Sequence, residues 1–186
     1  MSSASFPDLS SPEAFLSWVA RQPVRFELVC GRLALMPPPD ERQVAIAVNA
    51  FTALHERLRG SPWRAFASDL MVELEASTRL FPDVTVAPAH TRGWTDRPRL
   101  IVEVVGGAAR EFDLAIKRAR YLAKAELAQL LFVDAERIWA QLWTIGQPEP
   151  VARTFTDLSA VLPLSALGVD LPLVELYEEL GPEPAG

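Results

Sequence analysis

The chain has very little cysteine or histidine and no long apolar run. Its 186 residues include one cysteine, Cys30, and two histidines, His55 and His90. A single cysteine excludes an internal disulfide and a cysteine-based zinc site, and it fits a reducing cytosol. The two histidines are too far apart in the chain to have the spacing of a zinc pair. No apolar stretch reaches the roughly 18 residues that a membrane span needs, so we expect a cytoplasmic protein without a membrane partner.

The chain also has fewer basic than acidic residues. The chain has 18 Lys and Arg against 24 Asp and Glu, which gives a net charge of −6. This balance argues against a protein that coats nucleic acid, because such proteins neutralise many phosphates. An enzyme with a local basic patch is not excluded, and bound metal would cancel part of the acidity.

The motifs of several enzyme classes are absent from the sequence. No serine lies in a nucleophile-elbow pattern, and no glycine-rich phosphate loop is present. Apolar residues make up 49% of the chain and charged residues 23%, which is typical of a globular protein. We expect one domain over residues 1–186. Its core would span about 25–145, with an N-terminal helix in 1–24 and a C-terminal strand and helix extension in 146–186.

The apolar patterns predict alternating helices and strands. Ser11 and Pro12 predict a helix start, and Cys30 and Gly31 predict a hairpin turn. Asp40 predicts the cap of a long helix whose apolar face carries Val44, Val48, Phe51 and Leu54 to Leu58. The expected helices span about 12–21, 40–59, 110–124 and 171–180, and the expected strands span about 26–36 (a hairpin), 63–67, 70–74, 84–87, 100–105, 130–134, 138–144 and 151–156. The fold class is α/β or α+β, with a central mixed sheet flanked by helices. The strands 100–105 and 130–134 should be parallel, joined by a crossover helix.

Two acidic residues lie in or beside apolar strands. Asp83 follows Pro82 and opens the run 84–87, and Glu103 lies in the middle of the run 100–105. A carboxylate buried without a partner is costly, and two carboxylates brought together repel each other. A divalent cation removes both costs. The pair is therefore a candidate metal site, and metal with carboxylates suggests phosphoester chemistry.

Each candidate residue also has a simpler interpretation. Asp83 alone fits a turn, and Glu103 fits a buried ion pair with Lys117 or Arg118. Lys117 fits a solvated helix face as well as a stripe that faces phosphate. Glu27 faces either solvent or the cleft of the site. Gln43, on the long helix, fits a solvated glutamine or a side chain that reaches the cleft. Trp139, Trp143 and Tyr177 fit the core or a subunit interface, with base stacking as the alternative.

Several segments occur in an order that resembles a known family. They are the hairpin 26–33, the proline-rich helix entry 37–43, Phe81-Pro82-Asp83-Val84, the strand 97–105, the helix 112–121 and the strand 132–134. Together they resemble the Uma-type restriction endonuclease family, within the PD-(D/E)XK nuclease superfamily. The resemblance covers roughly residues 25–145.

The resemblance implies a restriction-endonuclease-like fold and hydrolysis of DNA phosphodiesters that depends on Mg²⁺ or Mn²⁺. Asp83, Glu103 and the backbone carbonyl of Val104 would hold the metal. Lys117 would be the catalytic lysine and Glu27 a further acidic residue of the site. A homodimer or higher homo-oligomer is expected by analogy with nucleases that cut both strands.

The sequence departs from the family pattern at several positions. The superfamily usually has a lysine two residues after the glutamate, where this chain has Val105. Arg42 stands in place of a histidine, Gly106-Gly107-Ala108 replaces a Ser-Pro-Ser-like stretch, and the glycine that usually follows the Lys117 helix is missing. Two alternatives therefore stay open: a nuclease fold that binds nucleic acid or a protein partner without cutting, and a structural protein with ion-paired acids.

Overall fold

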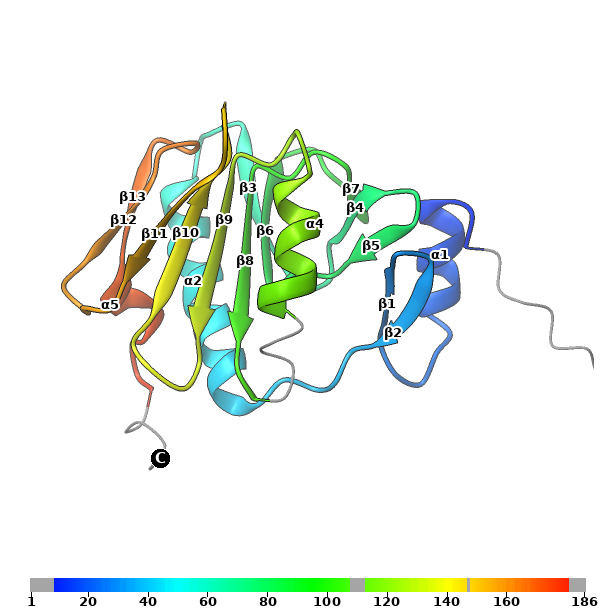
Figure 1. Ribbon diagram of the computed structural model, residues 1–186, viewed down its shortest axis with the longest axis horizontal. Helices are drawn as coiled ribbons and strands as arrows, with labels where there is room; N and C mark the ends of the chain where they lie inside the picture. Colours follow the sequence, from blue (N-terminus) through cyan, green and yellow to red (C-terminus); the bar gives the residue numbers. More distant parts are fainter. Residues whose placement is uncertain (1–8, 108–112, 147, 181–186) are drawn as a thin grey trace, which may run out of the picture.

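The computed structural model describes residues 9–107, 113–146 and 148–180. Most of the strands belong to two sheets (Figure 1). The large sheet contains β3 (Trp63–Ala67), β6 (Val84–Pro88), β8 (Leu100–Val105), β9 (Gln129–Asp134), β10 (Ala140–Thr144) and β11 (Val151–Phe155), in the order β11-β10-β9-β8-β6-β3. The small sheet contains β1 (Phe26–Val29), β2 (Arg32–Leu35), β4 (Met71–Glu75), β5 (Thr78–Leu80) and β7 (Trp94–Thr95), in the order β2-β1-β5-β4-β7.

The large sheet is mixed, as the sequence predicts. β8 and β9 are parallel, and their neighbours pair antiparallel. The segment between these two strands includes a π-helix, η2 (Asp113–Lys117), followed directly by α4 (Arg118–Leu122). Residues 110–112 of the predicted crossover helix lie outside the described residues. Every residue of β8 and β9 is buried, which is why both strands are nearly continuous apolar runs.

Helices cover both faces of the large sheet (Figure 1). On one face, α2 (Glu41–Arg57) packs through Ile46 and Leu54 on Val102 and Val104. On the other face, α4 packs through Tyr121 on the core residues that include Val105. The α1 helix (Pro12–Val19) covers the small sheet. Glu103 follows Val102 in β8, so its side chain points to the α4 face.

The apolar face of α2 differs from the prediction in its first half. Val44 and Val48 are 46% and 54% exposed, and the buried residues there are Ile46 and Ala50. In the second half, Leu54 and Leu58 are buried as predicted, together with Ala53. The helix carries two apolar stripes with similar spacing, so periodicity alone does not select between them. The small alanines of the second stripe allow the helix to pack closely against the sheet.

Three short features were not predicted. They are β5, β7 and the hairpin of β12 (Val161–Leu164) and β13 (Val169–Pro172). The closing helix α5 is shorter than expected and spans Leu173–Leu176. The remaining strands and helices lie close to their predicted ranges, and the α+β class with mixed sheets is confirmed.

The two sheets meet beside the predicted site. The chain leaves the small sheet after β5 and enters the large sheet at β6 through Phe81-Pro82-Asp83. Phe81 belongs to the core under α1, and Val84 belongs to the core under α2. Asp83 therefore lies at the junction of the two sheets. Within the described parts of the chain, no helix is long and apolar enough to cross a membrane.

Candidate active site

Asp83 and Glu103 lie next to each other on one face of the large sheet. In the antiparallel pair of β6 and β8, Val84 is opposite Val102 and Thr85 is opposite Ile101. One more step of this register brings Asp83 opposite Glu103, and directly opposite residues share a face. Asp83 is tied to β8 itself, because its Oδ2 accepts a hydrogen bond from the Val104 N–H at 2.7 Å.

Glu103 is held by two side chains from the helical segment above it. Its side chain is almost fully buried, at 4% exposure. The Oε1 atom accepts a hydrogen bond from the phenol of Tyr121 in α4, and it lies 3.5 Å from the Lys117 Nζ. The sequence did not single out Tyr121. The available signal was its position four residues after Lys117, where side chains share a helix face.

Lys117 bridges the two sheets. Its ammonium lies 3.2 Å from Glu27 Oε2 and 3.5 Å from Glu103 Oε1, and the side chain is buried. The interpretation of Lys117 as a solvated helix lysine is therefore wrong. The partner of Glu103 is Lys117, whereas the Arg118 guanidinium lies over the ring of Trp143, 5.5 Å from its centre. Lys117 ends the π-helix η2, and such segments are rare and frequent at functional sites.

Glu27 faces the site rather than solvent. The residue is 3% exposed, and its Oε1 accepts a hydrogen bond from the Phe81 N–H at 2.9 Å. Its other oxygen pairs with Lys117. Glu27 thus fixes the segment that leads to Asp83 and, at the same time, the position of the ammonium.

The backbone of Val104 completes the group. The N–H and C=O of one strand residue point to the same side, so its carbonyl is directed to the side of Asp83. This carbonyl accepts a hydrogen bond from Gln43 Nε2 at 3.4 Å. Gln43 also caps α2, because its Oε1 accepts from the Asp40 N–H at 2.9 Å. Gln43 therefore reaches the site, and its interpretation as a solvated side chain is wrong.

Gly106 allows the close approach of Gln43. A Cβ at this position would lie 3.3 Å from the Ala135 Cβ and 3.6 Å from Gln43 Nε2. The first contact is tighter than van der Waals packing normally allows. The glycine that follows the glutamate strand thus has a packing role beside the site.

Position 105, where the superfamily usually has its lysine, is occupied by a buried core residue. Val105 is fully buried in the core cluster that contains Tyr121. A longer, charged side chain would not fit there without displacing this core. The ammonium reaches Glu103 from η2 instead.

The donor set fits a hard divalent cation. Asp83, Glu103 and the Val104 carbonyl offer only oxygen, which Mg²⁺ and Mn²⁺ prefer and zinc sites rarely use alone. In the described ranges, no three His, Cys, Asp or Glu side chains are grouped so as to hold a metal by themselves. Mg²⁺ does not need such a cage, because it is usually held by one or two carboxylates together with water and substrate phosphate.

The charge of the cluster favours the same conclusion. Glu27, Asp83 and Glu103 supply three carboxylates, and Lys117 supplies one ammonium. Carboxylates grouped in this way repel one another, and a divalent cation would offset this repulsion.

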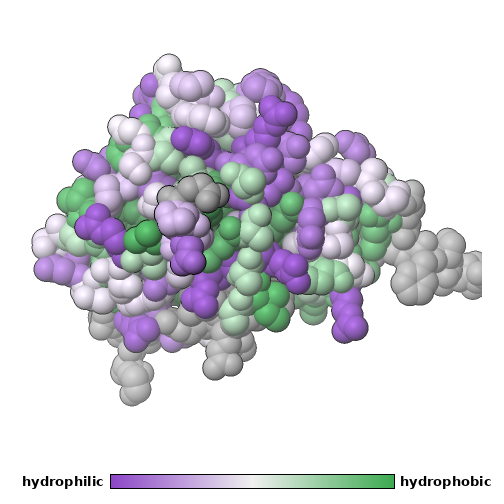
Figure 2. Space-filling view, turned by 45° about the horizontal axis from the view of Figure 1, so that its top comes forward, coloured by the Kyte–Doolittle hydropathy of each residue, from purple (hydrophilic) through white to green (hydrophobic). Residues whose placement is uncertain are grey.

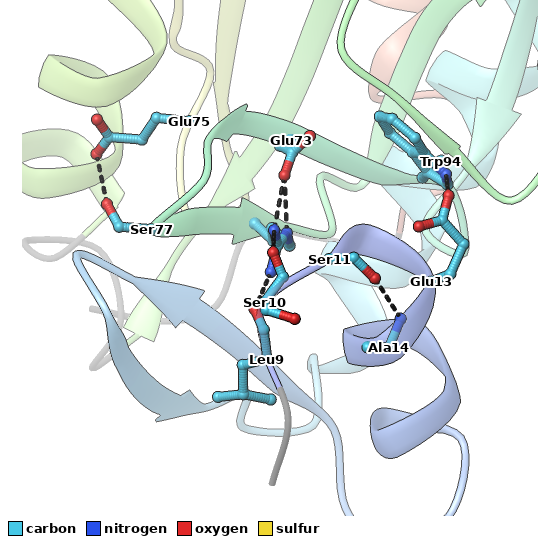
Figure 3. A network of polar contacts seen from close by, with 10 residues as sticks. Leu9, Ser10, Ser11, Glu13, Ala14, Glu73, Glu75, Ser77 and Trp94 are labelled. Atoms are coloured by element: carbon cyan, nitrogen blue, oxygen red, sulfur yellow. Dashed lines mark hydrogen bonds and ion pairs between the residues drawn. The ribbon is translucent and has the colours of Figure 1, made fainter.

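A second polar network, in the small sheet, is structural (Figure 3). Arg79 is 1% exposed, and its guanidinium donates to Glu73 Oε1 at 2.8 and 3.0 Å and to the Leu9 carbonyl at 2.6 Å. Glu75 accepts from the Ser77 hydroxyl. Glu73 thus neutralises a buried arginine that anchors the segment before α1.

Comparisons with known proteins identify a matching family, a similar sequence and a similar fold. A family model named Uma2, with the description "Putative restriction endonuclease", matches residues 12–173. An uncharacterized protein from Synechocystis sp. is 27% identical over 183 residues, which are 96% of each chain. The crystal structure of "a putative nuclease belonging to DUF820" from Anabaena variabilis superposes with a TM-score of 0.70 at 14% identity. This superposition covers 90% of the present chain and 97% of the other. At that identity, the similarity shows the fold.

Proposed function

The chain belongs to the Uma2 family, and from this membership we propose that it is a metal-dependent endonuclease that hydrolyses DNA phosphodiester bonds. One observation carries the proposal. Asp83 and Glu103 lie side by side, with the Val104 backbone bound to the first and a buried lysine beside the second. The restriction-endonuclease description belongs to the family, and the nuclease description belongs to the structural neighbour.

In this proposal, Asp83, Glu103 and the Val104 carbonyl hold Mg²⁺ or Mn²⁺. When bound, the metal lowers the pKa of a water molecule and offsets negative charge on the phosphate. The protein keeps the carboxylates in place without the metal. The Val104 N–H fixes one Asp83 oxygen, and the Tyr121 hydroxyl fixes one Glu103 oxygen. Such preorganisation lowers the cost of reaching the transition state.

Lys117 supplies a positive charge beside the reacting phosphate. Its ammonium is desolvated and lies close to Glu103. A charge in such a site stabilises negative charge on a phosphate oxygen more strongly than it would in water. Glu27 also pairs with this ammonium, at 3.2 Å, and so helps to position it.

The test is DNA cleavage by the purified protein in Mg²⁺ or Mn²⁺. Glu103→Gln preserves the shape of the side chain and removes its charge, so we expect the rate to fall by about 100-fold or more. Asp69→Asn is the matched control, because the Asp69 side chain is 96% exposed and lies outside the cluster. Cleavage by Glu103→Gln at the wild-type rate would contradict the proposal, as would the absence of cleavage by the wild-type protein with either metal.

A second candidate function is binding of nucleic acid without cleavage. Two observations favour this function. Val105 occupies the position of the usual lysine, and the Lys117 ammonium already pairs with Glu27 and Glu103. The two functions differ in their response to metal. A ligand that binds only the folded state stabilises it, so a cleaving enzyme should show a higher melting temperature in millimolar Mn²⁺. A binding protein without a metal site should show no such shift.

A further inference from the structure

A row of side chains on β10 runs beside the acidic cluster. Glu103 is paired in register with Phe132 of β9, and Phe132 is paired with Gln141 of β10. Gln141 is thus two strands from Glu103, about 10 Å away, on the same face of the sheet. Trp139 and Trp143 flank Gln141 on that face, and both pack against the core cluster under α4.

This part of the sheet face is open. In Figure 1, α4 lies in front of β8, and no described helix lies in front of β10 and β11. Trp139, Gln141 and Trp143 are all partly exposed. The surface seen in Figure 2 has hydrophobic residues in small groups separated by hydrophilic ones, which is unlike the continuous apolar face of an obligate subunit interface.

A positively charged side chain lies over one of these partly exposed tryptophans. Arg118 follows Lys117 directly, and its guanidinium lies 5.5 Å from the centre of the Trp143 ring. Among the described residues, Arg118 forms no ion pair with a carboxylate. The Trp143 indole N–H donates to Gln141 Oε1 at 2.9 Å, which fixes the ring. A guanidinium stacked on a fixed ring keeps its N–H donors directed outward for an anion.

Flat aromatic side chains combined with an arginine free of carboxylates are suited to a nucleic-acid strand. Bases stack on aromatic rings with little dependence on sequence, and arginine binds the phosphates. The charge complementarity is local, because the whole chain has a net charge of −6. Two copies of the chain would each have a net charge of −6 and would repel each other.

We propose that Trp139, Gln141, Trp143 and Arg118 form a surface that binds the substrate strand next to the scissile phosphate. The proposal rests on the nuclease function proposed above and adds the surface that the nucleic acid contacts. Two to three nucleotides would span the distance from the acidic cluster to β10. Arg118 would bind a phosphate, and the stacked pair of Arg118 and Trp143 would contact a base.

The experiment measures binding of a fluorescent single-stranded oligonucleotide by anisotropy, with EDTA present so that cleavage does not occur. Arg118→Ala and Trp143→Ala should each weaken binding at least about fivefold. Arg118→Ala should also reduce the slope of log K against log salt by about 0.7. Arg153→Ala is the matched control. Arg153 stacks on Phe155 at 5.3 Å, but it lies opposite Leu142 and so on the other face of the sheet. Its replacement should leave affinity unchanged.

The outcomes separate this inference from the function on which it rests. If the wild-type protein cleaves DNA and all three variants bind the oligonucleotide equally well, the proposed binding surface is wrong. The nuclease proposal would then remain intact. No binding and no cleavage by the wild-type protein would overturn both. A wild-type dimer that becomes monomeric in Trp143→Ala, measured by sedimentation, would assign the surface to a second copy and also overturn the inference.

Discussion

At the scale of single residues, Tyr121 has a role that its sequence context conceals. The residue is fully buried and packs in a cluster with Val105 and Phe132, as an ordinary core aromatic does. Its hydroxyl nevertheless donates to Glu103. In an apolar core, a phenol needs a hydrogen-bond partner, and here that partner is the carboxylate of the candidate site. We infer that Tyr121 positions Glu103 without contacting the substrate.

Tyr121→Phe tests this positioning role. The change keeps the ring and removes only the hydrogen bond to Glu103. Loss of such an outer partner typically weakens metal affinity or activity by about 10- to 100-fold. We expect a loss in this range for Mn²⁺ affinity, measured by calorimetry, together with slower DNA cleavage. Wild-type values for both quantities would show that the contact serves packing alone.

The residues of the site differ in how visible they are in the sequence. Glu103 is conspicuous because it interrupts an apolar strand, and Asp83 is conspicuous beside it. Gln43 and Tyr121 reach the same group only through long-range contacts, with Val104 and Glu103. Nothing in their local sequence distinguishes them from a surface glutamine or a core tyrosine. Residue patterns therefore predict the acids and offer Lys117 or Arg118 as an ion-pair partner. The tertiary structure selects Lys117 and adds the contacts of Gln43 and Tyr121.

At the scale of helices and strands, the sequence again predicts elements that follow from a local pattern and misses those that depend on distant contacts. Long apolar strands such as β8 and β9 are predictable, because only a buried strand explains a continuous run of branched residues. The short strand β5, Thr78–Leu80, contains a charged residue, Arg79, whose burial depends on Glu73. In β12, Pro163 argues against a strand, but the residue lies in a two-stranded hairpin where a missing N–H is tolerated.

Tyr177, directly after α5, ties the end of the chain to the large sheet. Its hydroxyl lies 2.8 to 3.0 Å from the carbonyls of Asp134, Arg137 and Trp139, and it accepts from the Trp139 N–H. Burial raises the pKa of Tyr177 from 10.0 to about 12. The folded state therefore favours the protonated phenol.

This pKa shift predicts a stability change at high pH. Because the folded pKa is higher than the unfolded one, the stabilisation by the Tyr177 hydroxyl is complete below pH 10 and is lost as pH rises through about 12. Urea unfolding of the wild-type protein and Tyr177→Phe checks this, since other titrating groups cancel in the difference. The difference in unfolding free energy should shrink between about pH 10 and 12. A constant difference would contradict the assignment.

At the scale of the whole molecule, the candidate site is also the junction between two sheets. Glu27 comes from the small sheet, Glu103 comes from the large sheet, and Lys117 pairs with both. The same side chains would thus serve catalysis and hold the two sheets together. A buried charge that loses its partner is strongly destabilising, so this junction should be sensitive to substitution.

Lys117→Met measures the contribution of this junction. The change leaves Glu27 and Glu103 buried without their shared ammonium, and we expect a loss of about 3 kcal/mol in unfolding free energy by urea denaturation. Arg120→Met is the matched control, because Arg120 pairs with Glu75 where both side chains are about half exposed. Such a surface pair contributes less than about 1 kcal/mol. Equal losses in the two variants would show that Lys117 does not bridge the sheets.

The most direct measurement is the anomalous diffraction of crystals grown with millimolar Mn²⁺. We predict an anomalous peak bound by carboxylate oxygens of Asp83 and Glu103 and by the Val104 carbonyl. Crystals of Glu103→Gln should lose this peak. Wild-type crystals with no Mn²⁺ at these three residues, and with Lys117 still paired to Glu27 and Glu103, would contradict the assignment of the cluster as a metal-dependent active site.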